Sequence, residues 1–350
     1  MKILFISGRE PSYTRNSVII KGLKNNSIDI LECTSNKKTY FKRYIEVISK
    51  FLLKKDYDIV FVGFLGQPLV PIIKKLTKKP IILDAFISIY DTLCFDRKTY
   101  TPNSIFGRVA YKLDENSCNL SDLVLLDSKA HVDYFNNTFN IKTDFKRLFV
   151  GADTEVFFPQ NQTICSNDFN IFYYGTYLPL QGIEIIIKSA KLLEKYPEIK
   201  FKIVGRGPES TKIEDLAKQL HIKNIEFINW IPYEKLPIEI SNSDICLGGH
   251  FGSIDKGKRV ISGKTFQFLA MKKPVIVGNN PANKELLEHE KSAMFVEHDS
   301  PEDLAEKILE LKNDIELRKK IAENGHKTFK KKCTPEKIGL ELKEIIEKMI

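Results

Sequence analysis

Short runs of apolar residues recur along the chain, separated by polar and charged segments. Most runs contain four to seven residues rich in β-branched and aromatic types, and many end at a glycine or a small polar residue. Such runs are typical of buried strands in a parallel sheet. The pattern predicts six strands in each half of the chain, at residues 2–7, 29–34, 58–63, 80–84, 122–128, 146–151, 169–175, 200–205, 225–229, 244–249, 274–278 and 293–296.

Several of the intervening segments show helical spacing. Ile183, Ile186, Ile187 and Ala190 lie on one face of a helix, and residues 300–303 supply a cap, a first-turn proline and two acids. Alternating strands and helices form doubly wound parallel sheets. We therefore predict an α/β protein with two Rossmann-like doubly wound parallel-sheet domains that face a central cleft.

The domain boundary is expected near residues 151–159, before a polar stretch at 160–168. This divides the chain into a first domain at 1–158, a second at 159–332 and a terminal helix at 333–350. Open α/β sheets bind ligands beyond the carboxyl ends of their strands. The predicted strand ends carry Gly8, Gly63, Asp84, Gly175, Gly205, Gly248 and Gly278.

The composition is typical of a soluble globular protein, and the charged residues are distributed unevenly along the chain. The 350 residues are 43% hydrophobic and 28% charged, with 54 Lys and Arg against 45 Asp and Glu, a net charge of +9. Residues 1–80 hold 16 basic and 6 acidic residues, so the excess belongs to the first domain. The amino terminus lacks the apolar core of a signal peptide, and no apolar stretch reaches the roughly 20 residues of a spanning helix. We expect a cytoplasmic protein whose six cysteines are reduced packing residues: Cys33, Cys94, Cys118, Cys165, Cys246 and Cys333.

The basic excess concentrates in residues 36–55, where apolar residues at helical spacing are surrounded by lysines and arginines. This predicts a basic amphipathic helix, either an ordinary helix with a solvated face or one that attaches to the anionic inner face of a membrane. Nucleic-acid binding is disfavoured because the chain lacks interleaved basic and aromatic residues. Near the end of the first strand, Gly8, Arg9 and Arg15 are candidates to bind a phosphate group of a ligand.

Candidate chemistry in the second half begins at the Gly175 turn, which opens the helix at Ile183 and suggests an anion site. Residues 204–209, including Arg206, repeat this geometry, although a plain turn explains them equally well. His250 follows two glycines at a strand end and is a candidate functional histidine.

Two further cations, Arg259 and Lys264, precede a short apolar helix. They suggest a shared anionic ligand, and a solvated basic loop is the alternative.

At this point residues 146–312 resemble the carboxy-terminal domain of GT-B-fold retaining glycosyltransferases of family 4. The matching landmarks are Gly175 with Gln181-Gly182, Gly205-x-Gly207-Pro208, Asn229-Trp230-Ile231-Pro232, Ser243-Asp244, Leu269-Ala270 with Pro274-Val275-Ile276, and Lys284-Glu285-Leu286-Leu287. The resemblance implies a nucleoside-diphosphate sugar in the second domain, an acceptor at the first, and donor contacts at Gly175, Thr176, Arg206, Trp230 and Ile231. It also implies that the terminal helix at 333–350 crosses back to the first domain.

This sequence departs from the family's pattern at four positions. Thr176 and Gln181 stand where the family commonly has an arginine and a lysine, and Arg259 and Gln267 stand where it has two glutamates. We infer that Arg259 and Lys264 bind the diphosphate instead, and that Gln267 contacts the ribose hydroxyls.

The resemblance also places Asp84 at a strand end where the family usually has a histidine. We expect Asp84 near the transferred sugar, with a strand-end turn cap as the alternative. The sugar would pass, with retention, to a lipid-linked or glycan acceptor in surface polysaccharide or glycolipid synthesis, and no metal or other cofactor is expected. A sugar-nucleotide 2-epimerase and a catalytically silent sugar-nucleotide-binding protein are the alternatives.

Overall fold

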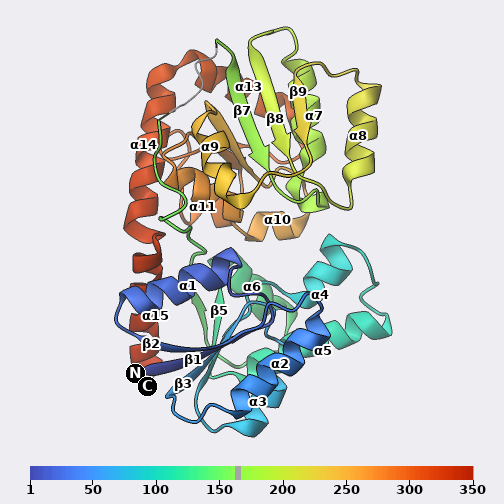
Figure 1. Ribbon diagram of the computed structural model, residues 1–350. Helices are drawn as coiled ribbons and strands as arrows, with labels where there is room; N and C mark the ends of the chain where they lie inside the picture. Colours follow the sequence, from blue (N-terminus) through green and yellow to red (C-terminus); the bar gives the residue numbers. More distant parts are fainter. Residues whose placement is uncertain (162–166, 350) are drawn as a thin grey trace. The chain divides into compact units, whose positions relative to one another are not determined.

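The computed structural model describes residues 1–161 and 167–349 and divides into two compact units (Figure 1). Unit 1 comprises Met1–Asp153 and Lys332–Ile350, and unit 2 comprises Thr154–Lys331. The boundary therefore falls between residues 153 and 154, rather than after residue 158 as expected. Cys165 and most of the polar stretch at 160–168 lie outside the described residues.

The sheet of unit 1 has six parallel strands in the order β2-β1-β3-β4-β5-β6. The predicted runs form these strands, although the last is shorter because the chain leaves the ladder after Arg147. The strands are β1 Lys2–Ser7, β2 Asp29–Cys33, β3 Ile59–Gly63, β4 Ile81–Asp84, β5 Leu123–Leu126 and β6 Phe145–Arg147.

The helices of unit 1 are α1 Thr14–Asn25, α2 Tyr40–Leu52, α3 Val70–Leu76, α4 Ile89–Asp91, the π-helix η1 Thr92–Asp96, α5 Ile105–Leu120, α6 Lys129–Thr138 and α15 Pro335–Met349. Side chains of α2, α3, α5 and α6 enter one buried cluster with the strands, so these helices cover the same face of the sheet. The terminal helix α15 packs against α1, where Gly22 and Gly339 let the two backbones approach closely.

Unit 2 has a second parallel sheet in the order β12-β11-β10-β7-β8-β9. Its strands are β7 Phe169–Tyr174, β8 Ile199–Val204, β9 Ile225–Ile228, β10 Ile245–Gly249, β11 Val275–Gly278 and β12 Met294–Val296. Its helices are η2 Pro179–Gln181, α7 Ile183–Leu192, α8 Ser210–Gln219, η3 Tyr233–Lys235, α9 Leu236–Ser241, α10 Asp255–Arg259, α11 Gly263–Ala270, α12 Pro281–Lys284, α13 Pro301–Asn313 and α14 Ile315–Lys332.

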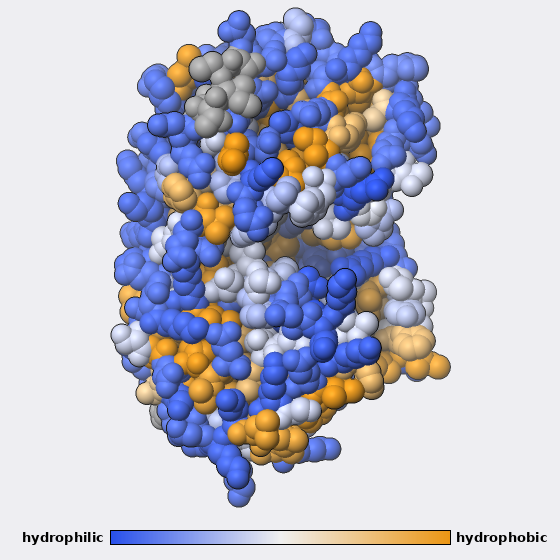
Figure 2. All heavy atoms as spheres, in the orientation of Figure 1, coloured by the Kyte–Doolittle hydropathy of each residue, from blue (hydrophilic) through white to orange (hydrophobic). Residues whose placement is uncertain are grey.

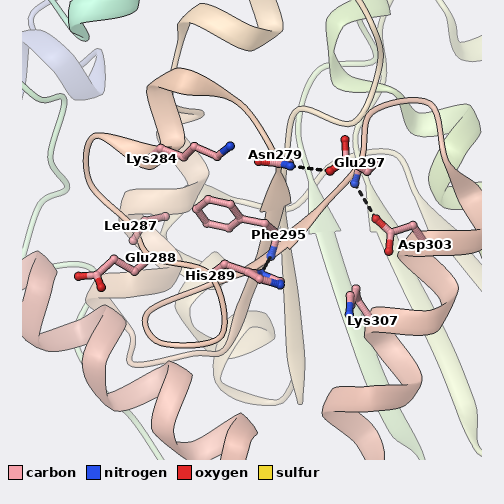
Figure 3. Close-up of a pocket in the computed structure, with 9 residues that line it drawn as sticks. All are labelled: Asn279, Lys284, Leu287, Glu288, His289, Phe295, Glu297, Asp303 and Lys307. Carbon is pink, nitrogen blue, oxygen red and sulfur yellow. Dashed lines mark hydrogen bonds between the residues drawn. The ribbon is translucent and has the colours of Figure 1, made fainter.

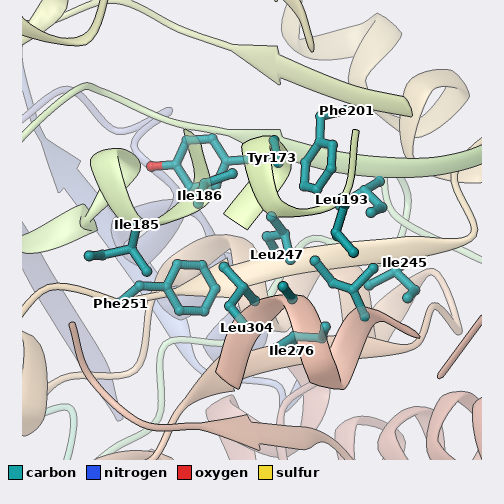
Figure 4. Close-up of a cluster of buried hydrophobic side chains, with 14 of the residues drawn as sticks. Tyr173, Ile185, Ile186, Leu193, Phe201, Ile245, Leu247, Phe251, Ile276 and Leu304 are labelled. Atoms are coloured by element: carbon teal, nitrogen blue, oxygen red, sulfur yellow. The ribbon is translucent and has the colours of Figure 1, made fainter. Parts of the chain in front are cut away.

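The core of unit 2 lies between this sheet and two helices that pack against each other, α7 and α13 (Figure 4). Tyr173, Phe201 and Leu247 from the strands belong to one buried cluster with Ile186 of α7 and Leu304 of α13. The helical spacing read from residues 183–190 therefore marks the side of α7 that faces the sheet. The prediction of two doubly wound parallel sheets is confirmed.

Two observations concern the whole described part of the chain. None of its helices combines the length and the hydropathy that crossing a lipid bilayer requires. The cysteines it includes are buried and carry free thiols: Cys33, Cys94, Cys118, Cys246 and Cys333.

Candidate donor site in the second unit

A pocket of about 430 Å³ lies at the carboxyl ends of β7, β8 and β9. It brings together five of the residues expected at the donor: Gly175, Thr176, Arg206, Trp230 and Ile231. These residues come from three successive strand ends, which meet because the strands are parallel neighbours in the sheet. The Trp230 side chain is 73% exposed, so its ring is available to a planar ligand.

Glycine is required at the turns of this pocket for close packing. Gly175 has φ +156° and Gly205 has φ +143°, and a Cβ on Gly205 would lie 1.9 Å from the Gly175 carbonyl oxygen. The amide of Gly175 donates to Val204 O at 2.9 Å, and that of Gly205 donates to Ile228 O at 2.8 Å. The sheet therefore already uses the Gly175 N–H, which cannot donate to an anion at this turn.

The start of α7 is likewise unavailable as an anion site. A Cβ on its cap residue, Gly182, would lie 2.2 Å from the Gly252 amide nitrogen and 2.7 Å from the Phe251 carbonyl carbon. The backbone of residues 251–252 therefore packs directly against the first turn of α7. Positive charge for a bound anion has to come from side chains instead.

Lys264 supplies such a charge directly behind the Gly175 turn. Its Nζ donates to Gln181 Oε1 at 2.6 Å, Ser262 Oγ at 3.1 Å and Gly248 O at 3.4 Å, and lies 4.7 Å from the centre of the Tyr173 ring. A Cβ on Gly175 would stand 3.6 Å from this nitrogen. Within the described part of the chain all of its hydrogen-bond acceptors are neutral. Burial lowers the pKa of Lys264 to about 7.

His250, which directly follows β10, and Gln267, which lies on α11 with Lys264, are both buried. Burial, and then the positive charge of Lys264, lower the pKa of His250 to about 3, so its imidazole is neutral at physiological pH. The Oε1 atom of Gln267 and the Nδ1 atom of His250 are buried and have no protein partner among the described residues. Both atoms retain capacity for a ligand or a water.

Arg259 does not stand at the start of a helix, as the sequence suggested. It is the last residue of α10, whereas Lys264 lies in the first turn of the following helix, α11. The short helix α10 packs against η2, the element that ends in Gln181. Arg259 and Lys264 are thus on different helices that both approach Gln181.

A second pocket, of about 640 Å³, lies beside β11 and β12 (Figure 3). Its lining includes Lys284 and Lys307, but also three carboxylates, from Glu288, Glu297 and Asp303. Carboxylates outnumber ammonium groups there, so this pocket suits a diphosphate poorly. The motif at residues 284–287 belongs to this second pocket rather than to the first.

Two candidates in unit 1 are corrected by the structure. Arg15 and Asp84 form a fully buried ion pair: Nη2 donates to Asp84 Oδ1 at 2.7 Å, Nε donates to Oδ2 at 2.9 Å, and Nη1 donates to Leu148 O at 2.7 Å. Neither side chain has exposed surface. A sugar contact by Asp84 and a phosphate contact by Arg15 are both wrong, because each charge is already satisfied inside the unit.

Gly8 and Arg9 form the turn after β1. Their amides both donate to Phe64 O, at 3.0 and 3.1 Å, and a Cβ on Gly8 would lie 1.8 Å from Leu65 O. Gly8 is therefore needed for packing, and its amide does not face a ligand. The Arg9 guanidinium is partly exposed, bonded to Tyr40 Oη at 3.0 Å and Glu10 Oε1 at 3.2 Å, and it stays a candidate phosphate group.

The sequence analysis assigned no donor contact to four residues in or near this site. Asn229 and Tyr233 line the pocket beside Trp230, and a rule that includes every residue following β9 would have found them. Gln181 and Ser262 bind Lys264, and Gln181 was noted for its difference from the family rather than for a role. These contacts depend on the folded positions of η2 and α11, which spacing does not reveal.

The segment that forms this pocket matches a known sequence profile. Residues 168–314 match the sequence profile described as "Glycosyl transferases group 1". This segment holds all the strands of unit 2 and the pocket at Gly175. Unit 2 therefore carries a glycosyl transferase group 1 domain.

Similar proteins occur among curated sequences and among solved structures. An uncharacterized glycosyltransferase of Methanocaldococcus jannaschii is 26% identical over 250 residues, covering 71% of this chain and 64% of that protein. The chain thus spans just under two thirds of this curated relative. Sucrose-phosphate synthase from Thermosynechococcus elongatus aligns with a TM-score of 0.80 at 13% identity, over 100% of this chain and 99% of that one.

HepE of Anabaena in complex with UDP aligns with a TM-score of 0.76 at 14% identity, over 99% and 100% of the two chains. Its complex with UDP-glucose aligns with a TM-score of 0.72. The fold is that of GT-B glycosyltransferases, as the resemblance implied.

Proposed function

We propose that the protein is a glycosyltransferase that moves a sugar, with retention of configuration, from a UDP-sugar to a lipid-linked or glycan acceptor. The single observation that carries the proposal is the buried Lys264 ammonium behind the Gly175 turn, inside a glycosyl transferase group 1 domain. A buried amine with neutral neighbours is costly to fold around unless a ligand supplies the missing negative charge. A diphosphate is such a ligand.

The pocket accommodates the rest of a nucleotide. Trp230 in this pocket offers an exposed ring for a base. Gln267 is buried outside the pocket lining, and its unpartnered oxygen is proposed to accept a hydrogen bond from a ribose hydroxyl. HepE, which shares the fold, was solved with UDP and with UDP-glucose. These points support uridine as the base and a hexose as the transferred sugar.

The chemistry requires stabilisation of a leaving group. The anomeric C–O bond breaks and its electron pair leaves with the diphosphate, while the acceptor hydroxyl oxygen bonds the anomeric carbon and loses its proton. Lys264 and Arg259 are proposed to hold the negative charge that develops on the diphosphate, so the reaction needs no metal in this proposal. Neutral His250 is proposed to hydrogen-bond the sugar rather than to carry charge.

On the acceptor side, the basic first 80 residues and Arg9 favour an anionic, phosphate-bearing acceptor. A lipid-linked intermediate of surface polysaccharide or glycolipid synthesis has this chemistry. The protein would then work in the cytoplasm, as a peripheral protein on the inner face of the cell membrane.

The test combines binding and turnover. Trp230 is the single tryptophan, so UDP should quench its fluorescence if the base stacks on it. The protein is then incubated with labelled UDP-sugars and a membrane-lipid extract, with and without EDTA, and the label and its anomeric configuration are followed. The proposal is supported if labelled sugar appears in the lipid fraction with its anomeric configuration retained, and if this transfer also occurs with EDTA present. An epimerised nucleotide sugar, or UDP binding without any turnover, would replace it with one of the two alternatives.

A further inference from the structure

Unit 1 exposes apolar side chains on three helices that cover the same face of its sheet, α2, α3 and α5. Figure 2 shows apolar surface over these helices. Eight side chains on these helices or directly after α2 are between 45% and 81% exposed, and we call them the apolar face: Phe41, Ile45, Leu52, Leu53, Leu76, Ile105, Phe106 and Val109. Soluble proteins rarely gather so many exposed large apolar residues without a partner.

Helix α2 shows that these residues are surplus to the fold. Its inner side buries Val47 and Phe51 in the cluster under the sheet. Phe41, Ile45 and Leu52 repeat at spacings of four and seven residues on another side of the same helix, and they are exposed. The amphipathic pattern at residues 36–55 is therefore two apolar stripes, of which the sheet covers one.

The first two turns of α5 repeat this arrangement. Ile105 is 79% exposed and Phe106 is 61% exposed, whereas Gly107 and Ala110 face inward. The Phe106 ring stacks on Tyr100, with ring centres 4.8 Å apart, so it is held in place rather than loose. Removing the Ile105 and Phe106 side chains should therefore leave the packing of the core unchanged.

Exposed cations border the apolar face at α2 and α3. Lys42, Lys54 and Lys55 flank the α2 stripe, and a second group, Lys75, Lys78 and Lys79, lies in the last turn of α3 and just after it. Arg43 is an exception, because it is buried and donates to Gly8 O at 2.8 Å and to Lys37 O at 2.7 Å. Apolar side chains bordered by ammonium groups match the chemistry of an anionic lipid surface, which has acyl chains beneath acidic headgroups.

We propose that the apolar face of unit 1 inserts into an anionic lipid bilayer, with the surrounding lysines on the headgroups. This deepens the proposed function, on which it rests for its biological sense, because it names the surface that presents a lipid-linked acceptor. Insertion distinguishes this docking from the purely electrostatic attachment that charge alone would give. A second copy of the chain is the competing occupant.

The experiment measures sedimentation of the full chain with vesicles of phosphatidylglycerol and phosphatidylcholine, against phosphatidylcholine alone. Ile105→Ser with Phe106→Ser should lower partitioning at least tenfold at low and at high salt. Lys75→Gln with Lys78→Gln and Lys79→Gln should lower it roughly a hundredfold at low salt, and much less at 0.5 M salt. Matched controls in unit 2, Ile238→Ser with Ile315→Ser and Lys327→Gln with Lys330→Gln and Lys331→Gln, should bind as the wild type.

Depth of insertion has its own readout. With Trp230→Phe as background, Phe106→Trp places the one tryptophan on the apolar face, and brominated lipids should quench it. Binding without quenching, equal binding by the Ile105 and Phe106 variant, or no binding by the wild type would each overturn the proposal. The proposal would also be overturned if the wild type self-associated without binding vesicles and the Ile105 and Phe106 variant did not self-associate.

The two proposals can fail separately. Quenching and vesicle binding without any sugar transfer contradict the proposed function but still support insertion of the apolar face into a bilayer. Sugar transfer to a detergent-dispersed acceptor without vesicle binding contradicts only the insertion of the apolar face.

Discussion

Lys264 is the residue on which donor binding should depend most clearly. Its pKa of about 7 means that the amine gains its charge as the pH falls through neutrality. A diphosphate attracts the protonated form, so the dissociation constant of UDP-glucose should be flat below pH 7 and rise by up to about tenfold per pH unit above it. Isothermal titration between pH 6 and 9 measures this, and a UDP-sugar is the right probe because UDP itself has a phosphate that titrates near pH 6.

In Lys264→Met the affinity should be at least about tenfold weaker at pH 6 and should no longer vary with pH. His250, with its pKa near 3, stays neutral over this range and adds no slope. Lys273, just before β11, offers a matched control. It is also substantially buried, and its Nζ donates to Ser241 O and Ser243 O, which precede β10. Lys273→Met should retain the wild-type slope, and an unchanged slope in Lys264→Met would refute the assignment.

At this scale the sequence identified residue types better than it identified contacts. Trp230 and Arg206, which line the pocket, were singled out by a family landmark and by a strand end, and Lys264 was singled out as a cation before an apolar helix. Arg15 and Asp84 were misassigned because they lie 69 positions apart, and no local pattern shows that a helix residue reaches a strand end to form a buried pair. A charged residue at a strand end looks the same whether it awaits a ligand or already has a partner.

Among the elements, the junction of η2 and α7 should be intolerant of any side chain at Gly182. This residue has φ +66°, and a Cβ there would lie 2.2 Å from a backbone nitrogen that cannot move freely. Gly182→Ala should lower the free energy of unfolding by about 2 kcal/mol or more, and it should weaken UDP binding because Gln181 holds Lys264. Chemical denaturation and fluorescence titration measure the two effects.

Gly263 provides the comparison for this substitution. It is the first residue of α11, and a Cβ there would meet no atom within 4 Å. Gly263→Ala should therefore leave stability unchanged or raise it slightly, because alanine favours the helix. If both alanine variants behaved alike, the packing of residues 251–252 on α7 would not be the cause of the effect at Gly182.

For the whole molecule, the apolar runs predicted every strand of both sheets. The inner strands of unit 1, β1, β3, β4 and β5, are apolar almost throughout because they are buried on both faces. The edge strands β2, β6 and β9 are only partly buried and include charged residues. The place of the last helix was not readable from its own residues. The apolar stripe of α15, at Ile338, Leu342 and Ile346, would suit either unit. The structure pairs α15 with α1 through Gly22 and Gly339, a contact between opposite ends of the sequence.

The carboxyl end of the chain should therefore stabilise the unit that the amino end begins. Leu342 is fully buried on α15, whereas Leu340 on the same helix is 38% exposed. Leu342→Ala should lower the free energy of unfolding by about 2 to 5 kcal/mol, and Leu340→Ala by less than about 1 kcal/mol. Hydrogen exchange locates the effect: Leu342→Ala should reduce protection in β1 to β6 and α1, while β7 to β12 keep theirs. Equal loss in both sheets would show that the two units unfold together and that the last helix does not belong to unit 1 alone.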